Sequence, residues 1–174
     1  MAAKMYSFES QRLLIRQLAE SDNIDVYLSW MQNVSNYFIE SVNSNISKCD
    51  LYKYINEKNS NPDCIFLGIF DKQTNKHIGN GKFEPINIKE KFVVVGLFIG
   101  DMDFRGKGVA KEFIECCVQN FLLPMGIEKI LLGVNKQNVS AIKAYYKAGF
   151  CRSKVSRLDV SIDSIELELR INNS

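Results

Sequence analysis

The chain has 174 residues, of which 46% are hydrophobic, and this suits one folded domain spanning residues 1–174. Its net charge of +2 gives no strong electrostatic footprint for a nucleic acid or an anionic membrane. The longest apolar run, residues 92–99, is far shorter than the ~20 residues that a membrane-spanning helix needs, and the first residues lack the apolar segment of a signal peptide. We therefore expect a cytoplasmic protein, monomeric or homodimeric, with no nucleic-acid or membrane partner.

The cysteines and the histidine give no support for a metal site or a thiol catalyst. The cysteine count is odd, and no Cys-x-x-Cys or Cys/His metal spacing occurs. A catalytic cysteine would need a histidine, and the one histidine, His77, opens a predicted strand and is expected at the surface or at a strand edge. We expect no metal, and we expect five reduced cysteines that pack as small hydrophobic residues: Cys49, Cys64, Cys116, Cys117 and Cys151.

The first part of the chain predicts one strand and two helices. Residues 12–18 have the pattern of a strand with imperfect alternation, and Ser21 is a suitable N-cap for the first helix. Residues 32–46 are polar and rich in Asn and Ser, which indicates a loop or a broken helix. Ser47 is a suitable cap for the second helix, and residues 59–63 predict a turn.

The rest of the chain predicts a sheet and two further helices. Residues 92–99 are almost wholly apolar, as in a buried central strand, and apolar residues at helical spacing predict a long helix over residues 108–122. Asn138 and Gly149 are suitable N-cap and C′ residues for the last helix. The other predicted strands are residues 64–70, 77–83 and 130–134, with a closing antiparallel pair formed by residues 150–160 and 162–169.

The loop between the buried strand and the long helix has the features of an anion site. Its sequence, Asp-Phe-Arg-Gly-Lys-Gly-Val-Ala, occupies residues 103–110. The first turn of a helix has backbone N–H groups without partners, and their dipoles favour negative charge. Glycines at positions 106 and 108 let a ligand approach the backbone closely. The loop alone fits a phosphate or pyrophosphate site and a plain strand-to-helix turn about equally well.

A second segment, residues 138–150, changes this balance. Together the two segments resemble the GNAT superfamily of acetyl-CoA-dependent N-acetyltransferases. The first matches the family's Gln/Arg-x-x-Gly-x-Gly/Ala loop at Arg105, Gly108 and Ala110. The second matches its Asn-x-x-Ala-x-x-x-Tyr-x-x-x-Gly-Phe helix at Asn138, Ala141, Tyr145, Gly149 and Phe150.

The resemblance implies a fold and a cofactor. The fold is α+β, with a mixed, mostly antiparallel seven-stranded sheet, about four helices and two splayed central strands. The co-substrate is acetyl-CoA, whose pyrophosphate would lie on the loop and whose pantetheine would run between the strands at residues 92–100 and 130–134. The residues expected at the cofactor are Leu97, Phe98, Ile99, Arg105, Gly106, Lys107, Gly108, Val109, Ala110 and Asn138.

Two side chains are candidates for the chemistry. Tyr145 matches the family tyrosine that lies beside the thioester sulfur and protonates the leaving thiolate; a core aromatic on the helix face is the alternative. Many family members carry a glutamate near the central strand as a general base, but residues 92–99 contain no carboxylate. Glu84 is the nearest acid, with solvated surface charge as its alternative role. A water relay, or an amine that arrives neutral, would need no residue at all.

The acceptor pocket of the family is built by the first two helices, where aromatic residues are frequent in this chain. Trp30 and Phe38 are the candidates for it, with core packing as the alternative for each. Residues 78–80 and 96–101 resemble the branch that holds ribosomal-protein N-terminal acetyltransferases and bacterial aminosugar acetyltransferases. We expect transfer of acetyl to a primary amine in a ternary complex, with a small amine such as a nucleotide-linked aminosugar as acceptor. A protein N-terminus is the alternative acceptor, and a non-catalytic acyl-CoA-binding module is the alternative class.

Overall fold

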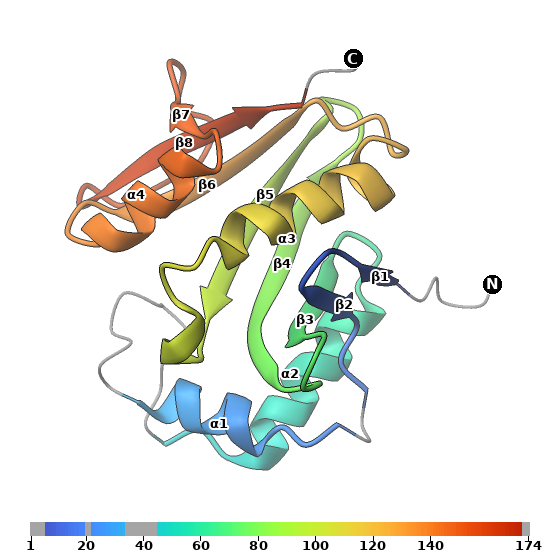
Figure 1. Cartoon of the computed structure of the whole chain (residues 1–174). Helices are drawn as coiled ribbons and strands as arrows, with labels where there is room; N and C mark the ends of the chain where they lie inside the picture. Colours follow the sequence, from blue (N-terminus) through green and yellow to red (C-terminus); the bar gives the residue numbers. More distant parts are fainter. Residues whose placement is uncertain (1–5, 20–21, 34–44, 172–174) are drawn as a thin grey trace.

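The fold is built on one sheet of eight strands, in the order β1-β2-β3-β4-β5-β6-β8-β7 (Figure 1). The computed structural model describes residues 6–19, 22–33 and 45–171. All neighbouring strands are antiparallel except β5 and β6, which are parallel and are joined by a helical crossover. The strands are β1 (Ser7–Glu9), β2 (Leu13–Arg16), β3 (Ile65–Asp71), β4 (His77–Asn87), β5 (Phe92–Ile99), β6 (Lys129–Asn135), β7 (Cys151–Arg152) and β8 (Ser164–Arg170).

The sheet confirms the expected α+β class and corrects two details of the sequence prediction. It has eight strands where seven were expected, because a hairpin precedes residues 12–18 and adds β1, with Ser10 Oγ accepting from Leu13 N in the turn. The strand predicted over residues 150–160 is also wrong in length, since β7 spans only two residues. The carboxylate of Glu166 accepts from the backbone N–H groups of Arg157 and Leu158, which holds that segment as a loop.

Four α-helices flank the sheet: α1 (Asp25–Gln32), α2 (Lys48–Ser60), α3 (Val109–Cys117) and α4 (Val139–Lys147). Ser47 caps α2 as predicted, and it does so in a reciprocal capping box with Asp50. The predicted cap Ser21 lies outside the described residues, and α1 starts after Ile24. A short 3₁₀ turn, η2 (Met102–Phe104), connects β5 to the loop before α3.

The long helix predicted over residues 108–122 changes its geometry after α3. Residues Val118–Leu122, η3, form a π-helical turn, in which Leu123 N donates to Val118 O. The chain then turns at Gly126, whose φ of 75° lies in the left-handed region, and enters β6. The crossover is therefore an α-helix with a π-helical end, and it returns the chain to the sheet beside β5.

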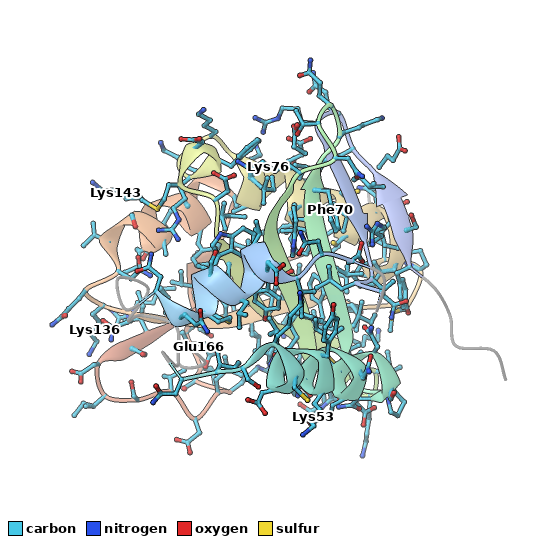
Figure 2. All side chains as sticks on the ribbon, turned by 90° about the horizontal axis from the view of Figure 1, so that it is seen from below. Lys53, Phe70, Lys76, Lys136, Lys143 and Glu166 are labelled. Atoms are coloured by element: carbon cyan, nitrogen blue, oxygen red, sulfur yellow. The ribbon has the colours of Figure 1, made fainter. Side chains whose placement is uncertain are left out.

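Two separate apolar clusters cover the two faces of the sheet. The larger one joins the sheet to α3 and α4 and has Phe83, Phe113 and Phe121 at its centre. The smaller one joins it to α1 and α2 through residues such as Phe66 and Phe70. Figure 2 shows α1 and α2 against the strands, with Phe70 in the interior and Lys53 on the outer side of α2. The alternation of side chains along β3 supplies both clusters, with Leu67 in one and Phe66 in the other.

No helix in the described ranges is both long and apolar enough to cross a membrane. In the same part of the chain, no three His, Cys, Asp or Glu side chains come close enough together to hold a metal ion. The five cysteines form no disulfide, and two of them, Cys49 and Cys151, are exposed.

Candidate active site

The two central strands separate partway along their length. β5 and β6 pair only as far as Val94 and Leu131, although β5 continues to Ile99 and β6 to Asn135. Beyond Val94, the edge of β5 that faces β6 therefore has no strand partner among the described residues. This is the splayed pair expected from the sequence, and its free backbone groups can bind an extended ligand.

A cavity of about 700 Å³ opens where the strands separate. It is lined from both faces of the sheet, by Asn138 and Tyr145 of α4 on one side and by Tyr54 and Lys58 of α2 on the other. Its volume lies within the range typical of small-molecule sites. Because it runs through the gap between the strands, two ligands that enter from opposite faces can meet inside it.

The loop before α3 presents unpaired backbone donors. Gly106 and Gly108 have φ angles of 72° and 80°, a conformation that glycine adopts without strain. Within the described chain, none of the N–H groups of residues 106–110 donates to a protein acceptor. A Cβ at Gly106 would have no atom within 4 Å, so the space beside the loop is open. These donors at a helix N-terminus fit a pyrophosphate.

An ion pair and its hydrogen bonds hold this loop, and the sequence analysis did not identify them. Arg12, just before β2, donates from Nη1 to Lys107 O at 3.0 Å and pairs with Glu112 Oε2 at 2.6 Å. Glu112 lies in the first turn of α3 and also accepts from Ser10 Oγ at 2.7 Å. Burial favours a higher pKa for Glu112, but these hydrogen bonds outweigh it and hold the pKa below its usual value. The first hairpin therefore fixes the position of the loop.

The helix α4 places Tyr145 at the cavity. Asn138 caps the helix, with its side chain accepting from Ala141 N, and Gly149 ends it with a φ of 94°, as predicted. Tyr145 is 9% exposed, and its ring packs edge-on against Phe150 at 5.5 Å. Burial raises the pKa of Tyr145 to about 12, so the phenol stays protonated at neutral pH. A protonated phenol at the cavity wall is a competent proton donor.

A cluster of charged side chains lines the opposite side of the cavity. Lys58 Nζ lies 2.9 Å from each carboxylate oxygen of Glu84. Lys82 Nζ lies 3.0 Å from the same carboxylate, and Asn61 Nδ2 donates to it at 3.1 Å. Partial burial favours a higher pKa for Glu84, but the two lysines outweigh it and hold the pKa below its usual value. Burial favours a lower pKa for Lys82, but its hydrogen bond to Glu84 and the nearby acidic groups of Tyr54 and Glu84 together outweigh it and raise the pKa.

Of the two aromatic residues singled out in the sequence for the acceptor pocket, only Trp30 lies within the described residues. The ring of Trp30 packs over Gly100 and lies edge-on to Phe98 at 5.8 Å. Phe98 lines the cavity and Trp30 does not, so Trp30 supports a cavity residue from behind. Phe38 lies outside the described residues. Among the described aromatic residues, the cavity is lined by Tyr27, Tyr54, Phe66, Phe98 and Tyr145.

The expected cofactor residues form two groups. Leu97 and Phe98 line the cavity, and Ile99 O accepts from Arg105 Nε at 2.7 Å. This bond ties the end of β5 to the start of the loop, although residues 105–110 do not themselves line the cavity. Asn138 also lines the cavity, at its α4 side.

Three of the contributors that the sequence analysis missed come from distant parts of the chain. Lys58 lies on α2, Asn80 lies on β4, and residues 159–161 reach the cavity from the segment before β8. These stretches are far apart in the sequence, and the strand register and the packing of α2 on the sheet bring them together. The expectation of a surface or edge position for His77 was wrong, because it is 8% exposed and its ring stacks on Phe70 at 4.8 Å.

Comparison with known families agrees with this geometry. Residues 12–151 match the family described as Acetyltransferase (GNAT) domain. The chain therefore belongs to the GNAT family and is an acetyl-CoA-dependent N-acetyltransferase, which confirms the expectation from the two motifs. With this assignment the chain is an enzyme, and the alternative class, a non-catalytic acyl-CoA-binding module, is excluded. A search of curated protein sequences found no significant match.

Solved structures share the fold at low sequence identity. The acetyltransferase MccE of microcin C7 self-immunity, solved with acetyl-CoA and AMP, is 21% identical with a TM-score of 0.76, and the match covers 93% of this chain and 94% of that one. Spermidine N-acetyltransferase from Vibrio cholerae, solved with CoA and spermine, is 20% identical with a TM-score of 0.71 and coverages of 92% and 96%. A Vibrio cholerae protein described as a candidate ribosomal-protein-serine acetyltransferase is 14% identical with a TM-score of 0.74 and coverages of 95% and 98%. At these identities the likeness establishes the fold alone.

Proposed function

We propose that the chain transfers the acetyl group of acetyl-CoA directly to the primary amine of a small molecule, with both substrates bound at once. The observation that carries this proposal is the cavity through the β5–β6 gap, which is lined by α4 on one face of the sheet and by α2 on the other. A cofactor on the α3–α4 face and an amine on the α1–α2 face would meet in that gap. No covalent intermediate on the protein is then needed.

The cofactor side would be formed mainly by backbone groups. The free N–H groups of residues 106–110 would bind the pyrophosphate, and the unpaired edge of β5 at residues 97–99 would bind the pantetheine. The MccE structure, which holds acetyl-CoA, has the same fold and supports this assignment. Arg12 and Arg105 would act indirectly, because each holds the loop through a backbone carbonyl.

Tyr145 is the proposed general acid. When the amine attacks the thioester carbonyl, negative charge develops on the departing sulfur, and a phenol O–H can donate its proton there. The pKa of about 12 keeps the proton on Tyr145 until that moment. Its burial, its packing against Phe150 and its place at the cavity wall fix the phenol in position.

The amine must lose a proton, and Glu84 is the one carboxylate on β4 that lines the cavity. Two lysines stabilise its charged form, so it is a weaker base than an unpaired glutamate. We infer that the proton leaves through water, or that the amine binds neutral, and that Glu84 holds Lys58 and Lys82 in place.

The acceptor panel that tests the proposal contains glucosamine, a nucleotide-linked aminosugar, spermine and a peptide with a free N-terminus. The assay measures thiol release from acetyl-CoA and the mass of the acetylated product. We expect amine-dependent thiol release, with the small aminosugars as better acceptors than the peptide. Thiol release that does not depend on any amine, or the absence of release with bound acetyl-CoA, would contradict the proposal.

A further inference from the structure

A bulge in β4 places His77 beside Asn80 on the acceptor side. Along the ladder with β3, Ile69 pairs with Gly79 and Phe70 pairs with His77, so β4 has one extra residue at this point. Residues three positions apart in a regular strand point to opposite faces of a sheet. The extra residue reverses this relation, and His77 Nε2 lies 2.9 Å from Asn80 Oδ1.

The hydrogen bonds of His77 determine how the Asn80 amide is oriented. His77 Nε2 also lies 3.0 Å from Gly79 O, and a carbonyl oxygen can only accept, so Nε2 carries the proton. The same N–H is shared with Asn80, which must present its oxygen to it. Because aromatic rings surround His77, with Phe70 at 4.8 Å and Trp30 at 5.1 Å, the imidazole is held in place.

This orientation turns the NH₂ group of Asn80 away from His77, and Nδ2 has no partner among the described residues. Asn80 is 5% exposed and lines the cavity. A buried donor without an acceptor is unfavourable, so a fixed one at a cavity wall indicates a ligand with an acceptor atom. In the β4–β5 ladder Asn80 pairs with Phe98, within the segment that we expect to bind pantetheine.

The charges near Asn80 point to the same kind of ligand. Lys82 and Glu84 follow Asn80 on the same face of β4, and Lys58 pairs with Glu84. Two cations and one anion give this cluster a net positive charge, which disfavours an acceptor with several ammonium groups. Among the described residues the cavity has one other carboxylate, Asp159, which belongs to the segment before β8 and is not counted in this cluster.

We propose that Asn80 Nδ2 donates a hydrogen bond to an oxygen carried next to the amine of the acceptor, and that His77 is the positioning residue for this contact. The site then selects amino alcohols, aminosugars and amino-acid amides, and it discriminates against linear polyamines, which have no oxygen. This inference rests on the proposed function and specifies its acceptor class.

Matched pairs of amines test the selection. trans-2-Aminocyclohexanol differs from cyclohexylamine by one hydroxyl, and phenylalaninamide differs from phenethylamine by one carboxamide. We expect kcat/KM for the oxygen-bearing member to exceed that of its partner by ~10-fold or more in at least one pair, as for a hydrogen bond to a fixed, desolvated donor. Spermine is expected to be a poorer acceptor than the oxygen-bearing amines.

Variants of Asn80 and His77 test the residues. Asn80→Ala should bring the ratio within each pair close to one, whereas Asn87→Ala, on the same strand and away from the cavity, should leave it unchanged. His77→Phe keeps the ring but loses the N–H, so it should lower the ratio, and His77→Gln should restore much of it because its amide can donate to Asn80. Acetyl-CoA affinity, measured by calorimetry, should be the same in all four variants.

The possible results separate this inference from the function on which it rests. Transfer to the amines with equal efficiency in each pair, or a ratio that survives Asn80→Ala, would contradict the inference and leave the acetyltransferase function standing. Transfer to none of these amines, with acetyl-CoA bound, would contradict the proposed function as well. A lower ratio in His77→Phe that His77→Gln does not restore would remove His77 from the contact.

Discussion

The two sides of the β5–β6 gap present different kinds of chemical group, backbone on one side and side chains on the other. On the α3–α4 side, the groups that we propose bind the cofactor come mostly from the backbone of one short segment, residues 105–110, and from the free edge of β5. On the α1–α2 side, the groups that we propose bind the acceptor are side chains from separate elements, such as Lys58 of α2 and Asn80 of β4. A backbone site binds a constant ligand with little dependence on side chains, whereas a side-chain site can be specific for one acceptor. The difference predicts that variants on the two sides fail in different ways.

A charged side chain at the loop should have the largest effect. Gly108→Glu places a carboxylate where the pyrophosphate is expected, and juxtaposed like charges cost several kcal/mol, ~10³-fold or more in affinity. We expect calorimetry to show no CoA binding. Gly126→Glu is the matched control, because Gly126 also has a positive φ but lies away from the site. An added Cβ would have no atom within 4 Å at Gly126 and only Arg12 Nη2, at 3.7 Å, at Gly108. Normal CoA affinity in Gly108→Glu would mean that the loop is only a turn.

Removal of the phenol hydroxyl should affect chemistry and leave binding unchanged. Tyr145→Phe keeps the ring that packs against Phe150, and loss of a general acid typically lowers kcat by ~10²–10⁴-fold. Acetyl-CoA affinity and melting temperature should be nearly unchanged, as expected for an interaction made only in the transition state. Tyr146→Phe, on the exposed side of the same helix, should behave as wild type. A lower melting temperature with kcat intact would instead assign Tyr145 a structural role.

A larger residue at Gly96 should affect the acceptor alone. Gly96 pairs with Lys82 in the ladder and lines the cavity, and a Cβ added to it would have no atom within 4 Å. Gly96→Val therefore fits the strand but reduces the space for the amine, and we expect KM for the amine to rise by about 10-fold. The affinity for acetyl-CoA should not change. Steady-state kinetics with each substrate varied in turn would show an equal rise in both KM values if the two sides were not separate.

The smallest effect on activity is expected for the charge of Glu84, which acts mainly on the stability of the fold. Because its pKa is lower in the folded chain than its usual 4.5, the charged form stabilises the fold above that pH, and the contribution is lost as the pH falls through the folded value. Glu84→Gln should lower the free energy of unfolding by about 1–3 kcal/mol at pH 7, and by less below pH 4.5. Denaturant titrations at both pH values would measure this.

The same variant tests the role of Glu84 in proton transfer. If the proton leaves through water or the amine binds neutral, the shape of the pH–rate profile should be the same in wild type and Glu84→Gln. A variant whose activity is low at neutral pH and recovers at high pH would show that Glu84 is the general base after all.

The parts of the fold that the sequence predicted depend on local chemistry. The caps at Asn138 and Ser47 and the C′ residue Gly149 are each defined within a few residues, and all three are present. The loop at residues 105–110 was predicted for the same reason. The motif pair also predicted the splayed strands, although only through the resemblance to a family.

The parts that were not predicted depend on contacts between distant segments. The length of β7 is limited by Glu166, whose carboxylate accepts hydrogen bonds from the N–H groups of Arg157 and Leu158. These residues belong to the segment predicted as a strand. The burial of His77 depends on a bulge, and nothing in a short stretch of sequence reveals the register between two strands. The cluster around Glu84 requires α2 and β4 to be neighbours, and residues 58 and 84 carry no local sign of that.

The two apolar clusters on opposite faces of the sheet have a consequence for how this chain can change over time. Among the described residues, the cluster under α1 and α2 shares no buried side chain with the one under α3 and α4. Substitutions at distant sites without shared partners have nearly additive effects on stability. The acceptor side can therefore accumulate replacements while the cofactor loop keeps its shape, and the molecule is divided into a part free to diversify and a part held constant.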